Sequence, residues 1–218
     1  PSDPSTADTT AGFHYSLALS EAALATSYAG ATDGSSKAFT FTDNGTYTIY
    51  GRIFDKDGGY TQYQTQVTVT NGNPTATLGN GGAVSEGSAG AVSFTAPQDP
   101  SSDDTTAGFH YAYDFNNDGT WDSGDGTYGG SLASASATVA ASYLDDGPGT
   151  RTVKGRILDK DGGYTDYTTT ITINNVNPTA SLSNNGPKAE GTAVTASMTN
   201  PSDPSTADTT AGFHYSLA

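Results

Sequence analysis

The amino-acid sequence predicts an all-β protein made of tandem β-sandwich domains, and three observations carry this prediction. Short stretches rich in Val, Ile, Thr, Tyr and Phe alternate in polarity and are bounded by clusters of Gly, Asn, Asp and Pro. No convincing apolar stripe with the helical period of about 3.6 residues runs through the chain. Long phrases of the sequence recur at fixed intervals, which is typical of repeat proteins.

Two of these phrases are long. Residues 1–18 return without a change as residues 201–218. The phrase GRIFDKDGGYTQY, which starts at Gly51, is repeated as GRILDKDGGYTDY from Gly155, 104 residues later. Such close identity indicates that the chain is built from copies of one kind of domain.

The shorter motif NPTA marks the domain boundaries, because it starts at Asn73 and again at Asn177, also 104 residues apart. We therefore expect one complete domain over residues 73–176. Before it lies a domain that lacks its first strand or strands, residues 1–72, and after it lie the N-terminal strands of the next domain, residues 177–218. The last segment and the first would together complete a copy of the shorter domain, which gives a period of 200 residues.

Each complete domain is expected to hold about seven short strands in about 100 residues, which predicts an immunoglobulin-like Greek-key β-sandwich. In the first domain, residues 17–29 predict a strand end that leads into a helical turn. Tyr47 is expected to form a tyrosine corner, in which its hydroxyl hydrogen-bonds back to the backbone, whereas Arg151 stands in its place in the complete domain. The strands predicted in the complete domain cover residues 91–96, 109–115, 136–144, 151–158 and 166–173.

Composition excludes several classes of partner. The formal net charge is −15, with 23 acidic residues against eight Lys and Arg, so binding to nucleic acid or an anionic membrane surface is disfavoured. No apolar run approaches the roughly 20 residues that cross a bilayer. The absence of Cys excludes disulfides and thiolate metal sites. The chain starts with Pro and has no signal-like segment, so we expect any export signal to lie outside this sequence.

The most specific motif is DFNNDGTWD, which starts at Asp114. Alternating oxygen-bearing side chains can turn inward around one hard cation such as Ca²⁺, and Gly119 permits the sharp turn. The motif lacks the Glu that closes an EF-hand, so it predicts a calcium loop on a β scaffold. An acidic turn that hydrogen-bonds to itself is the alternative. The predicted ligands are Asp114, Asn116, Asp118, Asp122 and the carbonyl of Thr120.

Two features resemble the polycystic kidney disease (PKD) domain, an immunoglobulin-like β-sandwich common in bacterial surface proteins and secreted hydrolases. The first is YDFNNDGTWDSGDG over residues 113–126, and the second is the turn DKDGG at residues 55–59 and 159–163. The resemblance covers the complete domain and most of the split one. The first domain has YSLALSEAALAT where the complete domain has YAYDFNNDGTWD, so it departs from the family at the acidic loop.

In such a sandwich the BC and FG loops share one end, next to the linker from the preceding domain. We therefore expect two further acidic clusters near the domain junctions, where Ca²⁺ would relieve the repulsion between carboxylates and stiffen the joint. Solvated loops that never meet closely are the alternative. The predicted residues are Asp99, Asp103, Asp104, Asp159 and Asp161 in the complete domain, and Asp3, Asp8, Asp55 and Asp57 in the first domain.

No pattern of catalytic residues is present, so we expect a protein that is not an enzyme. Each His lies in a copy of AGFHY, on the outer face of a predicted strand. The exact recurrence favours an extracellular structural protein: a cell-surface stalk, adhesin or filament of domains joined end to end, stabilised by Ca²⁺. Its expected partners are adjacent copies of itself, by covalent continuation or strand donation, with a surface glycan as a further candidate.

A carbohydrate- or protein-binding accessory module of a secreted hydrolase is the alternative function. In that case Trp121 and Tyr128 are the candidate sugar-stacking residues, although both are also suited to cover the edge of the sandwich.

Overall fold

The computed structural model describes residues 1–217. It divides into two compact units, which are described separately. The first contains residues 1–72 and 101–103, and the second contains the remaining residues.

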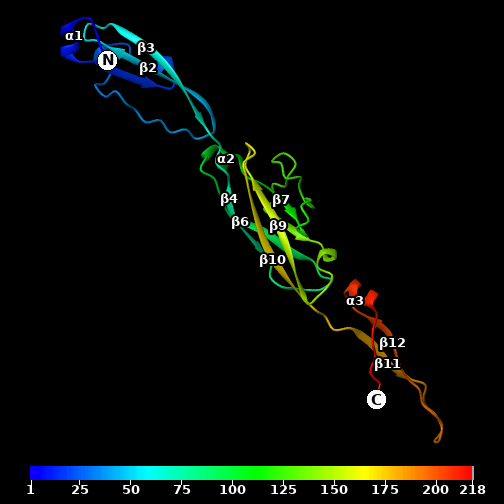
Figure 1. Ribbon diagram of the computed structural model, residues 1–218. Helices are drawn as coiled ribbons and strands as arrows, with labels where there is room; N and C mark the ends of the chain where they lie inside the picture. The colour runs from blue at the N-terminus through cyan, green and yellow to red at the C-terminus, as the bar shows by residue number, and fades with distance from the viewer. Residues whose placement is uncertain (218) are drawn as a thin grey trace. The chain divides into compact units, whose positions relative to one another are not determined.

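The second unit contains a complete two-sheet sandwich over the predicted complete domain (Figure 1). One sheet has the strand order β5–β10–β9–β7 and the other has the order β4–β6–β8. The chain passes between the sheets from β6 to β7, from β7 to β8 and from β8 to β9, as in a Greek-key sandwich. The elements are β4 (Thr75–Asn80), β5 (Val84–Ser85), β6 (Gly90–Gln98), α2 (Ser102–Ala107), β7 (His110–Asp114), β8 (Ser136–Val139), η3 (Ala141–Tyr143), β9 (Gly149–Leu158) and β10 (Tyr164–Asn174).

The core of this sandwich lies between the two sheets, where alternate residues of each strand point inward. Phe94 on β6 is its centre: the ring stacks on Tyr111 with 5.3 Å between centroids and meets Tyr167 edge-on at 5.8 Å. Gly155 on β9 lets Phe94 approach, since a Cβ atom there would lie 2.9 Å from the ring. The buried core residues are Val92, Phe94, Tyr111, Tyr113, Phe115, Val139, Leu144, Val153, Ile157, Ile171 and Ile173.

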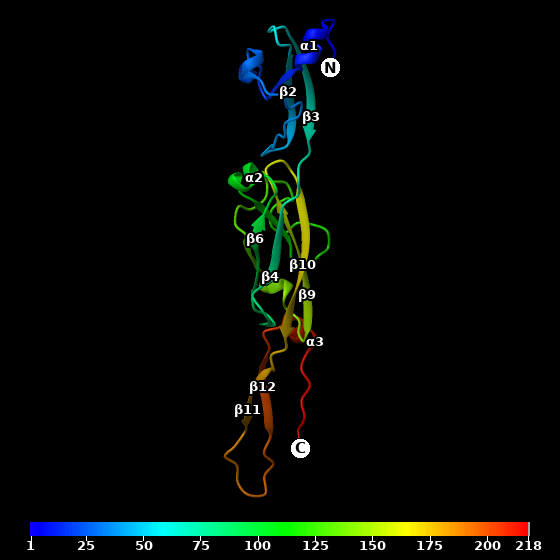
Figure 2. The same ribbon diagram turned by 90° about the vertical axis from the view of Figure 1, so that its left-hand side faces the viewer.

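The C-terminal part of the second unit is a hairpin followed by a short helix. Figure 2 shows the hairpin of β11 (Thr179–Asn184) and β12 (Ala196–Ser202), and helix α3 (Thr206–Ala211) follows it. Leu182 is paired with Met198 in this hairpin, and Leu78 with Phe94 in the β4–β6 hairpin. Every pair of the two hairpins agrees in register after a shift of 104 residues.

The first unit is a single antiparallel sheet with the order β1–β2–β3. The turns after β1 confirm the predicted strand end that leads into helical turns. The hydroxyl of Tyr47 donates to the carbonyl of Asp43 at 3.0 Å, which confirms the tyrosine corner. In the complete domain Arg151 Nε donates instead to the carbonyl of Tyr143 at 2.8 Å. The elements are α1 (Thr6–Ala11), β1 (His14–Ala18), η1 (Glu21–Ala23), η2 (Tyr28–Gly30), β2 (Gly45–Phe54) and β3 (Tyr60–Val69).

The fold confirms the predicted all-β, immunoglobulin-like class. The helices α1, α2 and α3 are six residues long, and each ends at the Ala of a copy of AGFHY. Within residues 1–217, no helix is long and apolar enough to cross a bilayer.

Candidate calcium sites

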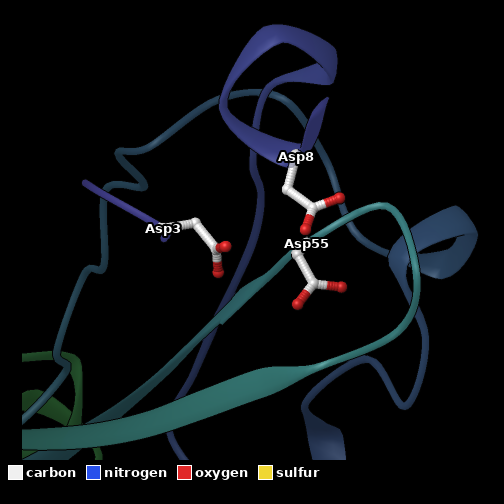
Figure 3. Close-up of side chains that lie close together, drawn as sticks. All are labelled: Asp3, Asp8 and Asp55. Atoms are coloured by element: carbon white, nitrogen blue, oxygen red, sulfur yellow. The ribbon is translucent and has the colours of Figure 1, made fainter. Parts of the chain in front are cut away.

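One group of carboxylates lies in the first unit. Figure 3 shows Asp3 on the N-terminal segment, Asp8 on α1 and Asp55 where the chain turns after β2. One oxygen of each carboxylate lies within 4.8 Å of the others. Local hydrogen bonds fix the three segments: Asp3 Oδ1 accepts from the backbone N–H of Ser5 at 2.7 Å, and Asp55 Oδ1 accepts from that of Gly59 at 2.9 Å.

A lysine already neutralises part of this group. Lys56 Nζ lies 2.9 Å from Asp8 Oδ1, and this hydrogen-bonded ion pair lowers the pKa of Asp8. Lys56 also pairs with Asp57, whose exposed carboxylate does not belong to the group of three. The structure therefore brings together three of the four residues predicted in this domain.

The complete domain carries a matching group at Asp99, Asp104 and Asp159, again with oxygens within 4.8 Å of one another. Asp104 and Asp159 are fully buried, and Asp159 Oδ1 accepts from the backbone N–H of Gly163 at 2.8 Å. Lys160 Nζ lies 2.9 Å from Asp104 Oδ1 and repeats the role of Lys56.

The other two residues predicted for this cluster are exposed. Asp103 lies on α2, and Asp161 pairs with Lys160 while its backbone N–H donates to Asp159. Asp103 belongs to none of these groups, whereas an oxygen of Asp161 lies within 4.8 Å of an oxygen of Asp104.

A third group joins Glu86, Asp203 and Asp208 within the second unit. Glu86 is buried, and its two oxygens accept from the backbone N–H groups of Val176 at 2.6 Å and Gly147 at 2.8 Å. Burial raises the pKa of Asp208, and the charges of Glu86 and Asp203 raise it further. Within residues 1–217, this group has no lysine comparable to Lys56, so its negative charge is the least compensated of the three.

Glu86 is a site residue that was not predicted from the sequence. A signal was available, because only three Glu residues occur in the chain and two of them, Glu86 and Glu190, precede a Gly at an interval of 104 residues. A Glu that recurs at the domain period in a chain that otherwise uses Asp indicates a position with a shared role. The role visible here is to bind the backbone at two places, between β10 and β11 and between η3 and β9.

The predicted calcium loop after β7 is folded around its own backbone. Asp114 is buried and accepts from the N–H groups of Asp118 at 3.1 Å and Gly119 at 2.9 Å. Asp118 accepts from Asn116 and Thr120, and Asp122 accepts from Phe115 and from the hydroxyl of Tyr143. These contacts favour the self-hydrogen-bonded turn, and the calcium role of this loop stays a prediction.

The candidate sugar-stacking residues are covered by neighbouring side chains. The guanidinium of Arg156 lies 5.0 Å and the ammonium of Lys154 lies 5.1 Å from the ring of Trp121. Tyr128 stacks on His110 with 4.0 Å between ring centroids. Cation–π and stacking contacts of this kind stabilise the edge of the sandwich.

No protein-family model and no curated protein sequence matches this chain. Among solved structures, the fibronectin(III)-like modules of Clostridium thermocellum CbhA align at 16% identity over 61% of this chain and 64% of that one, with a TM-score of 0.34. The extracellular cadherin domains 1–5 of protocadherin gamma B2 align at 16% identity over 88% and 39%, with a TM-score of 0.34. Drosophila N-cadherin EC1-4 aligns at 16% identity over 81% and 44%, with a TM-score of 0.31. This chain spans less than two thirds of the length of each of these structures.

Proposed function

We propose that this chain is a segment of an extracellular structural protein, a non-enzymatic stalk, adhesin or filament in which PKD-like β-sandwiches follow one another end to end. The observation that carries the proposal is the repetition of one structural plan. The β11–β12 hairpin has the register of the β4–β6 hairpin, and the β2–β3 pair has that of β9–β10 after the same shift of 104 residues. A repeating spacer of this kind is suited to a linear array, where each domain contacts only its neighbours.

We further propose that Ca²⁺ binds at the joints between consecutive domains. Asp203 and Asp208 occupy the positions of Asp3 and Asp8 in the repeated phrase. In an array the group containing Glu86 would therefore gain the counterparts of Asp55 and Lys56, so that four carboxylates and one ammonium meet at one joint. Hard oxygen ligands in this number suit Ca²⁺, and the ion would relieve the repulsion that raises the pKa of Asp208.

Calorimetric titration and thermal melting test the calcium proposal. The full chain should melt at a higher temperature in Ca²⁺ than in chelator. Its free energy of unfolding should increase by about 3 kcal/mol when the free Ca²⁺ concentration is 100 times the Kd. Glu86→Gln should reduce the shift, whereas Glu21→Gln, outside all three groups, should leave it unchanged. Equal melting of the wild type in Ca²⁺ and in chelator would contradict this part of the proposal.

Electron microscopy of a chain of several periods tests the structural role. An end-to-end array should give extended particles whose length grows in proportion to the number of periods. Compact particles of irregular form would contradict it. The alternative of a carbohydrate-binding module predicts retention on insoluble polysaccharide, and the covered ring of Trp121 does not favour it.

A further inference from the structure

The sheet of the first unit carries a groove where the complete domain carries its core. The groove has a volume of about 370 Å³ and is lined by Tyr15, Leu17, Gly51, Ile53 and Tyr63 among others. Tyr63 is 64% exposed, which is unusual for a large aromatic side chain on the face of a sheet.

The internal repeat shows what fills this groove in the complete domain. The counterparts of Gly51 and Tyr63 there are Gly155 and Tyr167, and both contact Phe94. The counterparts of Tyr15 and Leu17 are Tyr111 and Tyr113, and Phe94 packs on these rings at 5.3 and 5.9 Å. The empty groove thus reproduces four of the surfaces that hold Phe94.

Met198 on β12 occupies, in the shorter type of domain, the position that Phe94 has in the complete domain. Met198 is 40% exposed, and its cross-strand partner Leu182 is 70% exposed. The β11–β12 hairpin therefore presents apolar side chains in the register of β4–β6, and among the described residues of the second unit no sheet packs over them.

We propose that the groove of the first unit receives the β11–β12 hairpin of another copy of this sequence, with Met198 in the place that Phe94 takes in the complete domain. This inference rests on the proposed end-to-end array and names the surfaces that join two copies. The hydrogen bonds of the complete domain show which further contacts to expect between the hairpin and the groove. Thr61 and Tyr63 should hydrogen-bond to the backbone of Pro178 and Ala180, as Thr165 and Tyr167 do to Pro74 and Ala76.

Paired differences between the two domain types support this occupant. A Cβ atom at Gly90 would lie 3.3 Å from Ile171 Cδ1. Its counterpart in the hairpin is the larger Val194, whereas the counterpart of Ile171 is Val67, which lacks that δ carbon. The larger residue on the hairpin thus meets the smaller residue on the sheet, and the missing δ carbon makes part of the room for the side chain that Val194 adds.

The order of elements along the chain identifies another copy as the occupant of the groove. In the complete domain the hairpin precedes its sheet, and helix α2 lies between them. Residues 201–218 and 1–18 are identical, so residue 200 of one copy can lead into the first unit of the next through the same helix and strand.

Thiol labelling tests the docking, and the chain is suited to it because it contains no Cys. A two-period chain consists of residues 1–200 followed by the full chain. We compare the labelling rate of Tyr63→Cys in the full chain with that of the same substitution in the second period of the two-period chain. Labelling of Cys at this position should be fast in the first case. It should be at least about tenfold slower in the second, because it then requires local opening of the domain. Tyr167→Cys, the matched position in the complete domain, should be equally slow in both chains.

Two variants at position 198 test whether the protection of position 63 comes from the hairpin. Met198→Asp in the first period should restore fast labelling, and Met198→Cys at that position should itself be protected in the two-period chain. Equal labelling at position 63 in both chains, together with an exposed thiol at position 198, would overturn the docking. Extended particles from the same two-period sample would then leave the proposed array standing, whereas compact particles would overturn the array itself.

Discussion

At the scale of single residues, identical aspartates acquire different electrostatic roles from their surroundings. Asp8 and Asp208 belong to the same repeated phrase, and the hydroxyl of Ser5 or Ser205 accepts from the backbone N–H of each. The ion pair with Lys56 lowers the pKa of Asp8. Burial and neighbouring carboxylates raise that of Asp208. The local sequence determines the turn, whereas contacts from elsewhere in the chain determine the direction in which the pKa of the aspartate shifts.

We predict that Lys56→Met raises the pKa of Asp8 in calcium-free buffer, as measured by carboxyl-carbon NMR titration. A carboxyl whose pKa is lower in the folded state contributes stability above its unfolded pKa, and this contribution is lost as the pH falls through the lowered value. The wild type should therefore lose its advantage over the variant on acidification. Lys160→Met, at the equivalent position of the complete domain, should leave the pKa of Asp8 unchanged.

We also predict that Asp114→Ala destabilises the complete domain by about 1–3 kcal/mol, because it removes the buried carboxylate that accepts from the backbone N–H groups of Asp118 and Gly119. Urea unfolding in chelator measures the change. Asp125→Ala, in the same loop but with an exposed acceptor, is the control and should cost less. If the loss appears only when Ca²⁺ is present, the loop is a metal site and the self-hydrogen-bonded turn is the wrong interpretation.

At the scale of elements, the repeated phrase separates local from non-local causes of structure. Its helix forms in both copies, as α1 and α3, with the same serine cap and a glycine at a positive φ, 89° at Gly12 and 86° at Gly212. The strand β1 forms only in the first copy, where it pairs with β2. The same residues after α3 have no assigned strand up to residue 217. The helix is therefore encoded locally, and the strand requires a partner.

Hydrogen exchange provides the test at this scale. We predict that the amides of β1, which pairs with β2 and whose Tyr15 N–H donates to the carbonyl of Thr32, exchange slowly, whereas those around Tyr215 and Leu217 exchange at rates close to an unstructured chain. The identical local sequence provides its own control. Equal protection of the two segments would show that the phrase forms its strand without β2.

The same distinction explains how much could be predicted from the sequence. Period, strand class and the tyrosine corner were predictable, because they depend on local patterns and on repetition. The group around Glu86 was not predicted, because its meeting with Asp203 and Asp208 depends on the path of the chain after β10. The hydrogen bonds of Asp114 were also beyond prediction, since a D-x-N-x-D-G pattern serves a cation and its own backbone equally well.

At the scale of the whole molecule, the chain carries one complete sandwich together with two parts that match each other. The groove of the first unit and the apolar face of the β11–β12 hairpin each expose side chains whose counterparts form the core of the complete domain. Burying both against one another adds hydrophobic stabilisation that a single copy of this segment does not obtain. The unit that folds cooperatively is therefore expected to run across the junction between copies.

Completion of a domain across the junction should increase the enthalpy of unfolding. The two-period chain should contain three complete sandwiches where the full chain contains one, because docking of the hairpin completes an additional domain. A domain of about 100 residues contributes an unfolding enthalpy of about 60–80 kcal/mol at its Tm, so the calorimetric enthalpy should increase more than twofold from one period to two. Met198→Asp together with Leu182→Asp in the first period should return the ratio of the two calorimetric enthalpies to about two. The substitutions prevent formation of the domain that is completed across the junction, so only its unfolding enthalpy is lost. A ratio of two in the wild type would mean that the domains add without joining across the junction.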